Sequence, residues 1–299
     1  MVGHSQDILK NFQPKHDYLI GFDSDGSVFD TMEIKQKECF CPNFIKYFKL
    51  QPISKYARET MEFVGLYSKW RGINRFAILL KTLEMLADRE EVKARGFSFI
   101  DLKSLRDWIG SGMPLANENL KEWVDKTEDS ILKKVLEWSM AVNQSISDLV
   151  FGIPPYPFVR ESLDKIVKQA DLLCISQTPY EALEREWTEH KIIKYAALIA
   201  GQEFGSKNEH LKLTAVGKYK LNHILLVGDA WGDLEAAKAN GTLFYPINPG
   251  DEVTSWKNFY EEGLVRFFNE TYQGEYEAEL INKFESLLPD TPPWKQRQV

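Results

Sequence analysis

Residues 18–27 read YLIGFDSDGS, and this stretch decides the fold. Its first half is a short apolar run, which is typical of a strand buried on both faces of a parallel sheet. The run stops at Asp23 and Asp25, and Gly26 follows, a residue that lets the chain leave a strand sharply. We therefore expect a buried strand that delivers two carboxylates to its carboxyl end, although Asp and Gly are also common in ordinary turns.

The same design recurs along the chain. Four more apolar runs are followed by polar residues: 171–176, 222–228, 195–200 and 243–246. The last two are weaker strand candidates. Segments with helical spacing separate them: 158–170, 180–191, 208–219 and 233–240. Strands that alternate with helices predict an α/β fold, a Rossmann-like doubly wound parallel sheet covered on both faces. Ligands of such sheets bind beyond the carboxyl ends of the strands, where the acidic residues of this chain fall.

Residues 31–150 contain no convincing strand and carry apolar residues at helical spacing. We interpret them as an all-helical domain inserted into the sheet domain, which would consist of residues 1–30 and 151–299. The chain after Pro249 looks helical and acidic and ends in a Pro-containing tail, residues 289–299. We expect this tail to be loosely ordered or to pack on the sheet domain.

Composition limits the possible partners. The 299 residues are 43% hydrophobic, enough for two cores, and carry a formal charge of −7. This balance gives no basic surface for nucleic acid. Because no run approaches the ~18 apolar residues that span a bilayer, we expect no membrane partner and a cytoplasmic protein. The sequence does not indicate an oligomeric state.

A second acidic cluster follows the run that ends at residue 228, where residues 228–233 read GDAWGD. Asp229 and Asp233 are four apart at a helix start, so they share one face. Asp233 could alternatively cap that helix. With Asp23 and Asp25, four carboxylates would meet at one edge of the sheet and repel one another unless a cation joined them. Carboxylate oxygens are ligands that Mg²⁺ prefers, so the sequence predicts a magnesium site.

The order of these motifs resembles that of the haloacid dehalogenase superfamily. Members carry an apolar strand ending in DxDG followed by Thr or Ser, a strand ending in Ser or Thr, a lysine at a helix start, and GDxxxD after a further strand. In this chain the four motifs are, in order, DSDGS at 23–27, Ser176, a lysine at 207 or 212, and GDAWGD at 228–233. The match covers residues 16–30 and 151–250.

The resemblance implies roles for the first two motifs. Asp23 looks like the family's nucleophile, which is also a metal ligand. Asp25 looks like its general acid and base, and would add its backbone carbonyl to the metal. Ser176 and the neighbouring Gln177 would bind the phosphoryl group of the substrate, together with backbone N–H groups at the next helix start.

The last two motifs would complete the site. Lys207, favoured over Lys212 because it falls at the helix start, would neutralise the nucleophile and the phosphate. Asp229 resembles the direct metal ligand. Asp233 would orient metal-bound water or the lysine.

The helical insert resembles the family's C1 cap, which supplies specificity for a small substrate. Arg71 and Arg75 lie in it beside Trp70 and would share a face if helical. They could bind an anionic or sugar portion of the substrate, or they could form a solvated cationic face.

The resemblance implies a magnesium-dependent phosphatase that hydrolyses a small phosphorylated metabolite, a phosphate monoester, through an aspartyl-phosphate. An Asp at position 25 indicates phosphate ester chemistry, since relatives with other leaving groups lack it. A sugar phosphomutase would use the same residues, and a binding relative without turnover is a further alternative.

Overall fold

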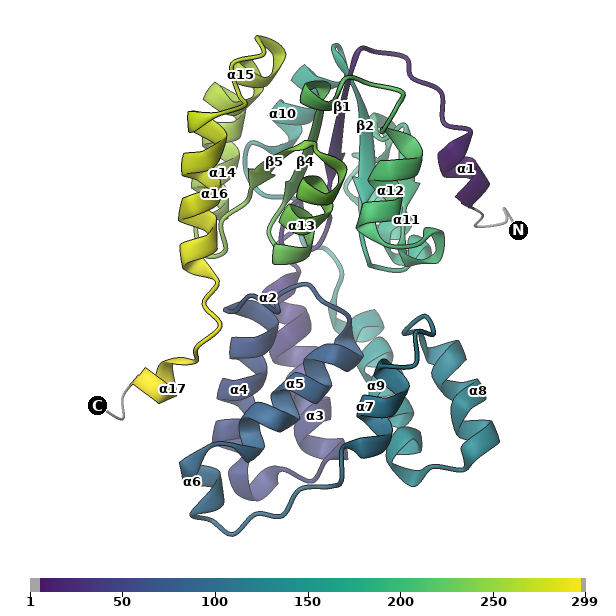
Figure 1. Cartoon of the computed structure of the whole chain (residues 1–299), viewed down its shortest axis with the longest axis vertical. Helices are drawn as coiled ribbons and strands as arrows, with labels where there is room; N and C mark the ends of the chain where they lie inside the picture. Colours follow the sequence, from purple (N-terminus) through teal and green to yellow (C-terminus); the bar gives the residue numbers. More distant parts are fainter. Residues whose placement is uncertain (1–5, 297–299) are drawn as a thin grey trace. The chain divides into compact units, whose positions relative to one another are not determined.

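The computed structural model describes residues 6–296 and divides the chain into two compact units (Figure 1). One unit contains the sheet and runs up to Thr31 and over Gly152–Pro289. The other contains Met32–Phe151 and the segment from Asp290 onward. The two internal boundaries differ by one residue from those expected, but the end of the chain belongs with the helical unit rather than with the sheet.

The sheet has five parallel strands: β1 (Tyr18–Phe22), β2 (Ala170–Ile175), β3 (Leu198–Ala200), β4 (Ile224–Gly228) and β5 (Leu243–Pro246). Their order is β3-β2-β1-β4-β5. Strands β2 and β3 thus lie on one side of β1, and β4 and β5 lie on its other side. The predicted α/β fold with a doubly wound parallel sheet is confirmed, and the strand order reverses between β1 and β4.

Helices bury both faces of the sheet. Ile20 and Phe22 of β1 join one core, and Leu19, which precedes them, joins the other, which explains why the run is apolar. The first core is completed by α10 (Val159–Ile166), α11 (Tyr180–Glu189), α14 (Glu252–Asn258) and α15 (Leu264–Phe268). The second is completed by α12 (Lys207–Thr214), α13 (Trp231–Asn240) and α16 (Glu275–Leu287).

Shorter elements connect these: α1 (Gln6–Lys10), the 3₁₀ turns η3 (Ile193–Tyr195), η4 (Gln202–Phe204) and η5 (Leu221–His223), and the π-helix η6 (Phe259–Gly263). Helix α12 ends five residues earlier than the expected helix at 208–219. Gly217 has a φ of +80° in the turn that follows, and the Tyr219 hydroxyl donates to buried Asp171 at 2.7 Å. The turn anchors the chain to the start of β2 instead of extending the helix.

The other unit is helical in every regular element that the structure describes there. In chain order these are α2 (Met32–Ile34), the π-helix η1 (Lys35–Phe40), α3 (Cys41–Tyr47), the 3₁₀ turn η2 (Gln51–Ile53), α4 (Ser54–Leu66), α5 (Arg75–Ala87), α6 (Glu90–Lys93), α7 (Lys103–Ile109), α8 (Asn117–Thr127), α9 (Ser130–Leu149) and α17 (Pro293–Gln296). Side-chain caps begin the two main helices: Asn74 accepts from the backbone of α5, and Asp129 from that of α9. Trp108 and Trp138 are fully buried in the core of this unit.

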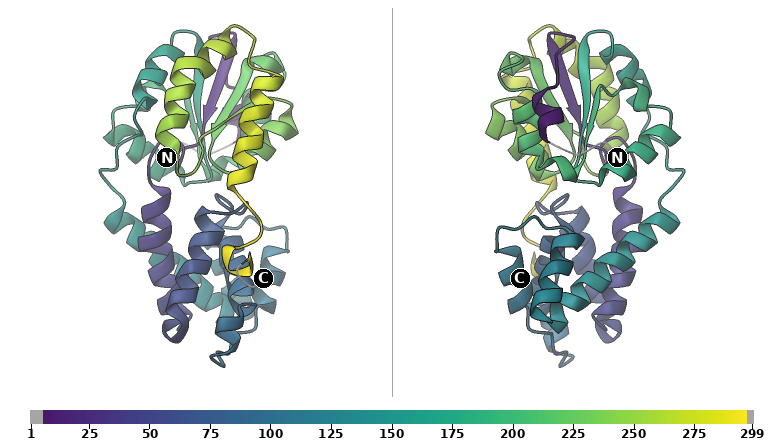
Figure 2. Two further views of the ribbon diagram at one scale, coloured as in Figure 1. Left: turned by 90° about the vertical axis from the view of Figure 1, so that its left-hand side faces the viewer. Right: turned by 90° about the vertical axis from the view of Figure 1, so that its right-hand side faces the viewer.

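The Pro-containing tail packs on the helical unit, so the expectation that it would be loose or lie on the sheet domain is wrong (Figure 2). The Arg89 guanidinium lies 4.3 Å from the centroid of the Trp294 ring, a cation–π contact. Lys295 Nζ lies 2.7 Å from a carboxylate oxygen of Asp88. These contacts give the tail partners that its sequence alone does not reveal. Residues 297–299 lie outside the described part of the chain.

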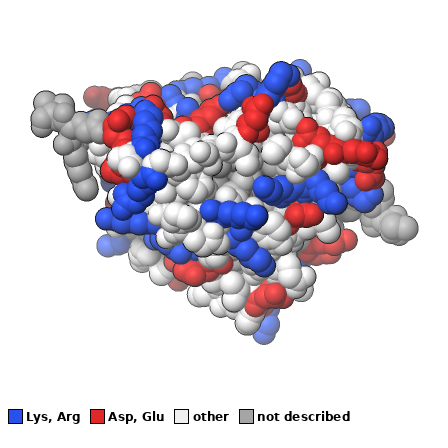
Figure 3. Space-filling view, turned by 90° about the horizontal axis from the view of Figure 1, so that it is seen from below, with Lys and Arg blue, Asp and Glu red and all other residues white. Residues whose placement is uncertain are grey.

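Charges of both signs are mixed on the surface. On the face drawn in Figure 3, lysine and arginine side chains are interspersed with aspartate and glutamate, so this face does not present a single sign of charge. Among the described helices, none combines the length and the apolar character that crossing a bilayer requires.

Candidate active site

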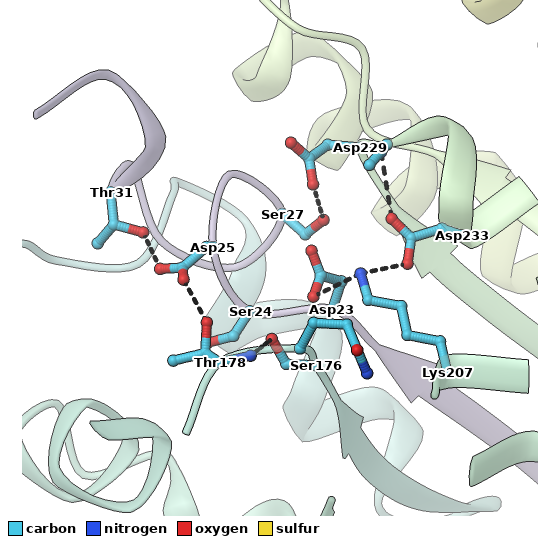
Figure 4. Close-up of polar contacts among 12 residues, drawn as sticks. Asp23, Ser24, Asp25, Ser27, Thr31, Ser176, Thr178, Lys207, Asp229 and Asp233 are labelled. Atoms are coloured by element: carbon cyan, nitrogen blue, oxygen red, sulfur yellow. Dashed lines mark hydrogen bonds and ion pairs between the residues drawn. The ribbon is translucent and has the colours of Figure 1, made fainter. Parts of the chain in front are cut away.

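The tips of β1 and β4 bring three carboxylates together at the point where the strand order reverses (Figure 4). Asp23 follows β1, Asp229 follows β4, and Asp233 lies in the first turn of α13. One carboxylate oxygen from each residue lies within 4.8 Å of the other two, and all three residues are buried. Sequence-distant acids therefore meet in the crevice where doubly wound sheets bind ligands.

A glycine makes room for Asp233. A Cβ atom at Gly228 would lie 2.3 Å from Asp233 Cγ, a separation that real structures do not tolerate. Asp233 Oδ2 accepts a 3.1 Å hydrogen bond from the backbone N–H of Ala230, so the side chain folds back over the start of its own helix. Asp233 therefore both caps the start of its own helix and belongs to the acidic cluster.

Lys207 joins the cluster from α12. A capping box fixes the start of this helix, because the Ser206 hydroxyl accepts from the Glu209 N–H and the Glu209 carboxylate accepts from the Ser206 N–H. Lys207 Nζ lies 2.6 Å from Asp233 Oδ1 and 2.9 Å from Asp23 Oδ1. Lys212 is exposed on the same helix. Of the two candidate lysines, the structure brings Lys207 to the carboxylates.

Burial and mutual repulsion govern protonation here. Burial raises the pKa of Asp23 well above its ordinary value; Lys207 lowers it, and Asp233 and Asp229 raise it further. Burial likewise raises the pKa of Asp233, against the opposing effect of Lys207. For Lys207, burial favours the neutral form, but Asp23 and Asp233 outweigh it and raise its pKa above the ordinary value. The lysine therefore stays charged, while the raised pKa values of Asp23 and Asp233 reflect the cost of holding buried carboxylates this close together.

The donor set fits a magnesium ion. If all three buried carboxyl groups ionise, the single ammonium between two of them balances only one charge, and a divalent cation would offset the remainder. All the candidate ligand atoms are hard oxygens, and Mg²⁺ binds to proteins through one or two carboxylates while keeping waters. Asp23 and Asp229 would be its ligands, whereas Asp233 is engaged by Lys207 and by the Ala230 N–H.

The Asp25 side chain does not join the carboxylate cluster, so the expectation that four carboxylates would meet is wrong. Its Oδ2 accepts a 2.7 Å hydrogen bond from the Thr178 hydroxyl, and its Oδ1 accepts from the Thr31 hydroxyl. Gly26, with a φ of +78°, turns the chain away directly after it. Figure 4 shows the carboxylate directed toward the two threonines. The part of its backbone carbonyl as a metal ligand stays a prediction.

Ser176 lies at the tip of β2, beside β1, and is buried. Its Oγ accepts a 3.3 Å hydrogen bond from the Thr178 N–H, and its own N–H donates to the Ala200 carbonyl at 3.0 Å. Gln177 Nε2 donates to the Gly205 carbonyl at 2.9 Å, and contact of this side chain with substrate stays a prediction. In this structure its side chain ties the loop after β2 to the loop that precedes Lys207.

Sequence reasoning missed both threonines that bind Asp25. Thr178 comes two residues after Ser176, and Thr31 follows the first motif. A hydroxyl residue shortly after a strand tip is a usable signal, but a weak one, since threonines are also common in turns.

Arg71 and Arg75 are bound by their own helical unit. Arg71 is 3% exposed and donates to the Leu66 carbonyl at 3.1 Å. Arg75 donates to Asn143 Oδ1 at 2.6 Å and to Ser139 at 3.2 Å, and burial lowers its pKa to about 10. The interpretation of these arginines as a solvated cationic face is therefore wrong. Contact of either arginine with a substrate stays a prediction.

Ser27 links the first motif to the last. Its hydroxyl donates to Asp229 Oδ1 at 2.8 Å, with both residues buried. Replacing Ser27 by Ala should weaken Mg²⁺ binding roughly tenfold, because a metal ligand loses the partner that orients it. Competition with Mn²⁺, followed by electron paramagnetic resonance, would measure this. Ser27→Thr keeps the hydroxyl and is the matched control; equal affinity of the Ala variant and the wild type would contradict the role.

No protein-family model matches the chain, and no curated protein matches it. Solved structures do resemble it. A haloacid dehalogenase-like family hydrolase from Xanthomonas campestris is 12% identical over 91% of this chain and 97% of its own, with a TM-score of 0.45. A haloacid dehalogenase-like family hydrolase from Streptococcus pneumoniae is 13% identical over 84% of this chain and 98% of its own, also with a TM-score of 0.45.

A third structure, described as a predicted phosphoglycolate phosphatase from Haemophilus somnus, is 13% identical over 77% of this chain and 84% of its own, with a TM-score of 0.46. These likenesses are too distant to assign a substrate or a mechanism, which have to come from the residues of the site.

Proposed function

We propose that the chain is a magnesium-dependent phosphatase of the haloacid dehalogenase superfamily that hydrolyses a small phosphate monoester through an aspartyl-phosphate. One observation carries the proposal: Lys207 lies within 3 Å of both Asp23 and Asp233, beside Asp229, at the switch point of the sheet. A buried nucleophile candidate, a fixed cation and carboxylates that can hold a divalent ion are the parts that phosphoryl transfer needs.

Asp23 is the attacking group. Its carboxylate oxygen forms a bond to phosphorus while the bond from phosphorus to the leaving oxygen breaks, which leaves the phosphoryl group on Asp23. Lys207 offsets the charge of both partners, and Ser176 binds the phosphoryl oxygens. Mg²⁺, held by Asp23 and Asp229, would reduce the repulsion between the phosphate and the nucleophile.

Asp25 moves the protons. Its carboxyl group protonates the leaving alkoxide in the first step, and its carboxylate then takes a proton from the water that hydrolyses the aspartyl-phosphate. The hydroxyls of Thr31 and Thr178 hold both of its oxygens, and they orient the group between these two steps. The helical unit would act as a C1-type cap that selects the substrate.

Phosphate release from a panel of phosphate monoesters, with sugar phosphates foremost, tests the proposal. With Mg²⁺ present we expect turnover of at least one ester. A chelator should reduce the rate to background, and excess Mg²⁺ should restore it, because the carboxylates repel phosphate when no cation offsets them. Release that is insensitive to chelation would contradict the magnesium role. No release from any ester, with interconversion that requires a bisphosphate activator, would instead indicate a phosphomutase.

A further inference from the structure

One side chain of helix α14 contacts the loop that contains the first motif, residues 23–27. Trp256 is fully buried, and its indole Nε1 donates a 2.7 Å hydrogen bond to the backbone carbonyl of Ser27. The hydroxyl of the same serine donates to Asp229 at 2.8 Å. A continuous chain of buried hydrogen bonds thus runs from the indole through one residue to a predicted metal ligand.

The indole is held rigidly. Its ring stacks on that of Phe22, with centroids 5.7 Å apart and planes 16° from parallel, and meets the Phe259 ring edge-on at 5.5 Å. The neighbouring Ser255 fixes the helix, because its carbonyl accepts from the Tyr245 hydroxyl at 2.7 Å and its Oγ accepts from the Asn248 N–H at 3.0 Å. The donor that reaches Ser27 therefore has little freedom to move.

Packing alone does not account for a tryptophan at this position. Trp108 and Trp138 are as deeply buried, yet their indole nitrogens have no hydrogen-bond partner among the described residues. At position 256 the indole N–H reaches an acceptor in the motif itself. A phenyl ring could supply the apolar contacts but not this hydrogen bond.

We propose that Trp256 is a positioning residue for the magnesium site: by fixing the Ser27 carbonyl it sets the peptide plane, and hence the direction in which the Ser27 hydroxyl holds Asp229. This inference rests on the proposed function, since it assumes that Asp229 binds the metal. The residue touches neither substrate nor metal, and it acts only through Ser27.

The test is Mg²⁺ affinity in the absence of substrate, measured by competition with Mn²⁺ in electron paramagnetic resonance. Trp256→Phe should weaken binding roughly three- to tenfold, at or below the range found for partners of metal ligands. Trp187→Phe is the matched control, because the Trp187 indole donates to the same loop, at Ser24 Oγ, but not to Ser27. Its affinity should stay within about twofold of the wild type.

A double variant separates positioning from general damage to the fold. If Trp256 acts through the Ser27 hydroxyl, Trp256→Phe combined with Ser27→Ala should bind Mg²⁺ no more weakly than Ser27→Ala alone, whereas independent effects would add. Additive losses, unchanged affinity in Trp256→Phe, or an equal loss in Trp187→Phe would overturn the inference. Should the phenylalanine variant fail to fold, Trp256→Met removes the same N–H with a flexible apolar side chain that supplies no donor. A wild type that binds no Mg²⁺ would instead overturn the proposed function itself.

Discussion

Asp23→Asn should abolish turnover, with a fall in kcat of roughly 10⁴-fold or more, because the amide cannot attack phosphorus. The measurement is steady-state phosphate release at saturating Mg²⁺ with the best ester of the panel. The fold should survive the change. Burial disfavours the charged form of Asp23, so a neutral side chain of the same shape should leave the midpoint of thermal unfolding unchanged or higher when Mg²⁺ is absent.

Asp30→Asn is the matched control for this variant. Asp30 lies in the same segment but is exposed, and its carboxylate accepts from the Tyr156 hydroxyl rather than joining the cluster. Its kcat should stay within a few-fold of the wild type. If Asp23→Asn kept more than about a hundredth of the wild-type kcat, an aspartyl-phosphate on this residue could not be the main route.

Lys207→Met should have two large effects. The rate should fall by roughly 10³-fold, because the fixed charge that stabilises the transferring phosphoryl group is lost. The free energy of unfolding should fall by roughly 3 kcal/mol in Mg²⁺-free buffer, because Asp23 and Asp233 lose the cation between them while staying buried. Denaturant titration measures the second effect. Added Mg²⁺ should restore part of the stability, since a cation that binds only the folded state stabilises it.

Lys212→Met makes the same chemical change five residues further along α12, on an exposed side chain. It should alter the free energy of unfolding by less than about 0.5 kcal/mol. Its rate should match the wild type. Loss of activity in Lys212→Met with normal activity in Lys207→Met would reverse the assignment of the active-site lysine.

The parts of this protein that the sequence predicts are those whose signal is local. Strands buried on both faces leave uninterrupted apolar runs, so β1, β2 and β4 could be located within one or two residues. The acidic residues that follow β1 and β4 had to converge once the sheet was parallel. The capping box at Ser206 and Glu209 likewise marks, in the sequence itself, the helix start that places Lys207.

The parts that sequence reasoning missed depend on pairs that are far apart along the chain. The orientation of Asp25 is fixed in part by Thr178, 153 residues away, and the contact between Ser27 and Trp256 spans 229 residues. A threonine or a tryptophan carries no periodicity that would indicate its partner. Only the fold brings these groups together, which is why the acidic cluster was expected to include the Asp25 side chain.

The docking of α17 on the helical unit has a consequence for synthesis of the chain. The last long helix of that unit ends at Leu149, but Trp294, which covers Arg89, is made 145 residues later. At the usual pace of translation this interval is roughly 7 to 30 s. During it the second segment of the sheet domain, Gly152–Pro289, is synthesised, while one surface of the helical unit lacks the contact with α17. The nascent helical unit is therefore exposed to chaperones and proteases at this surface until α17 has been made.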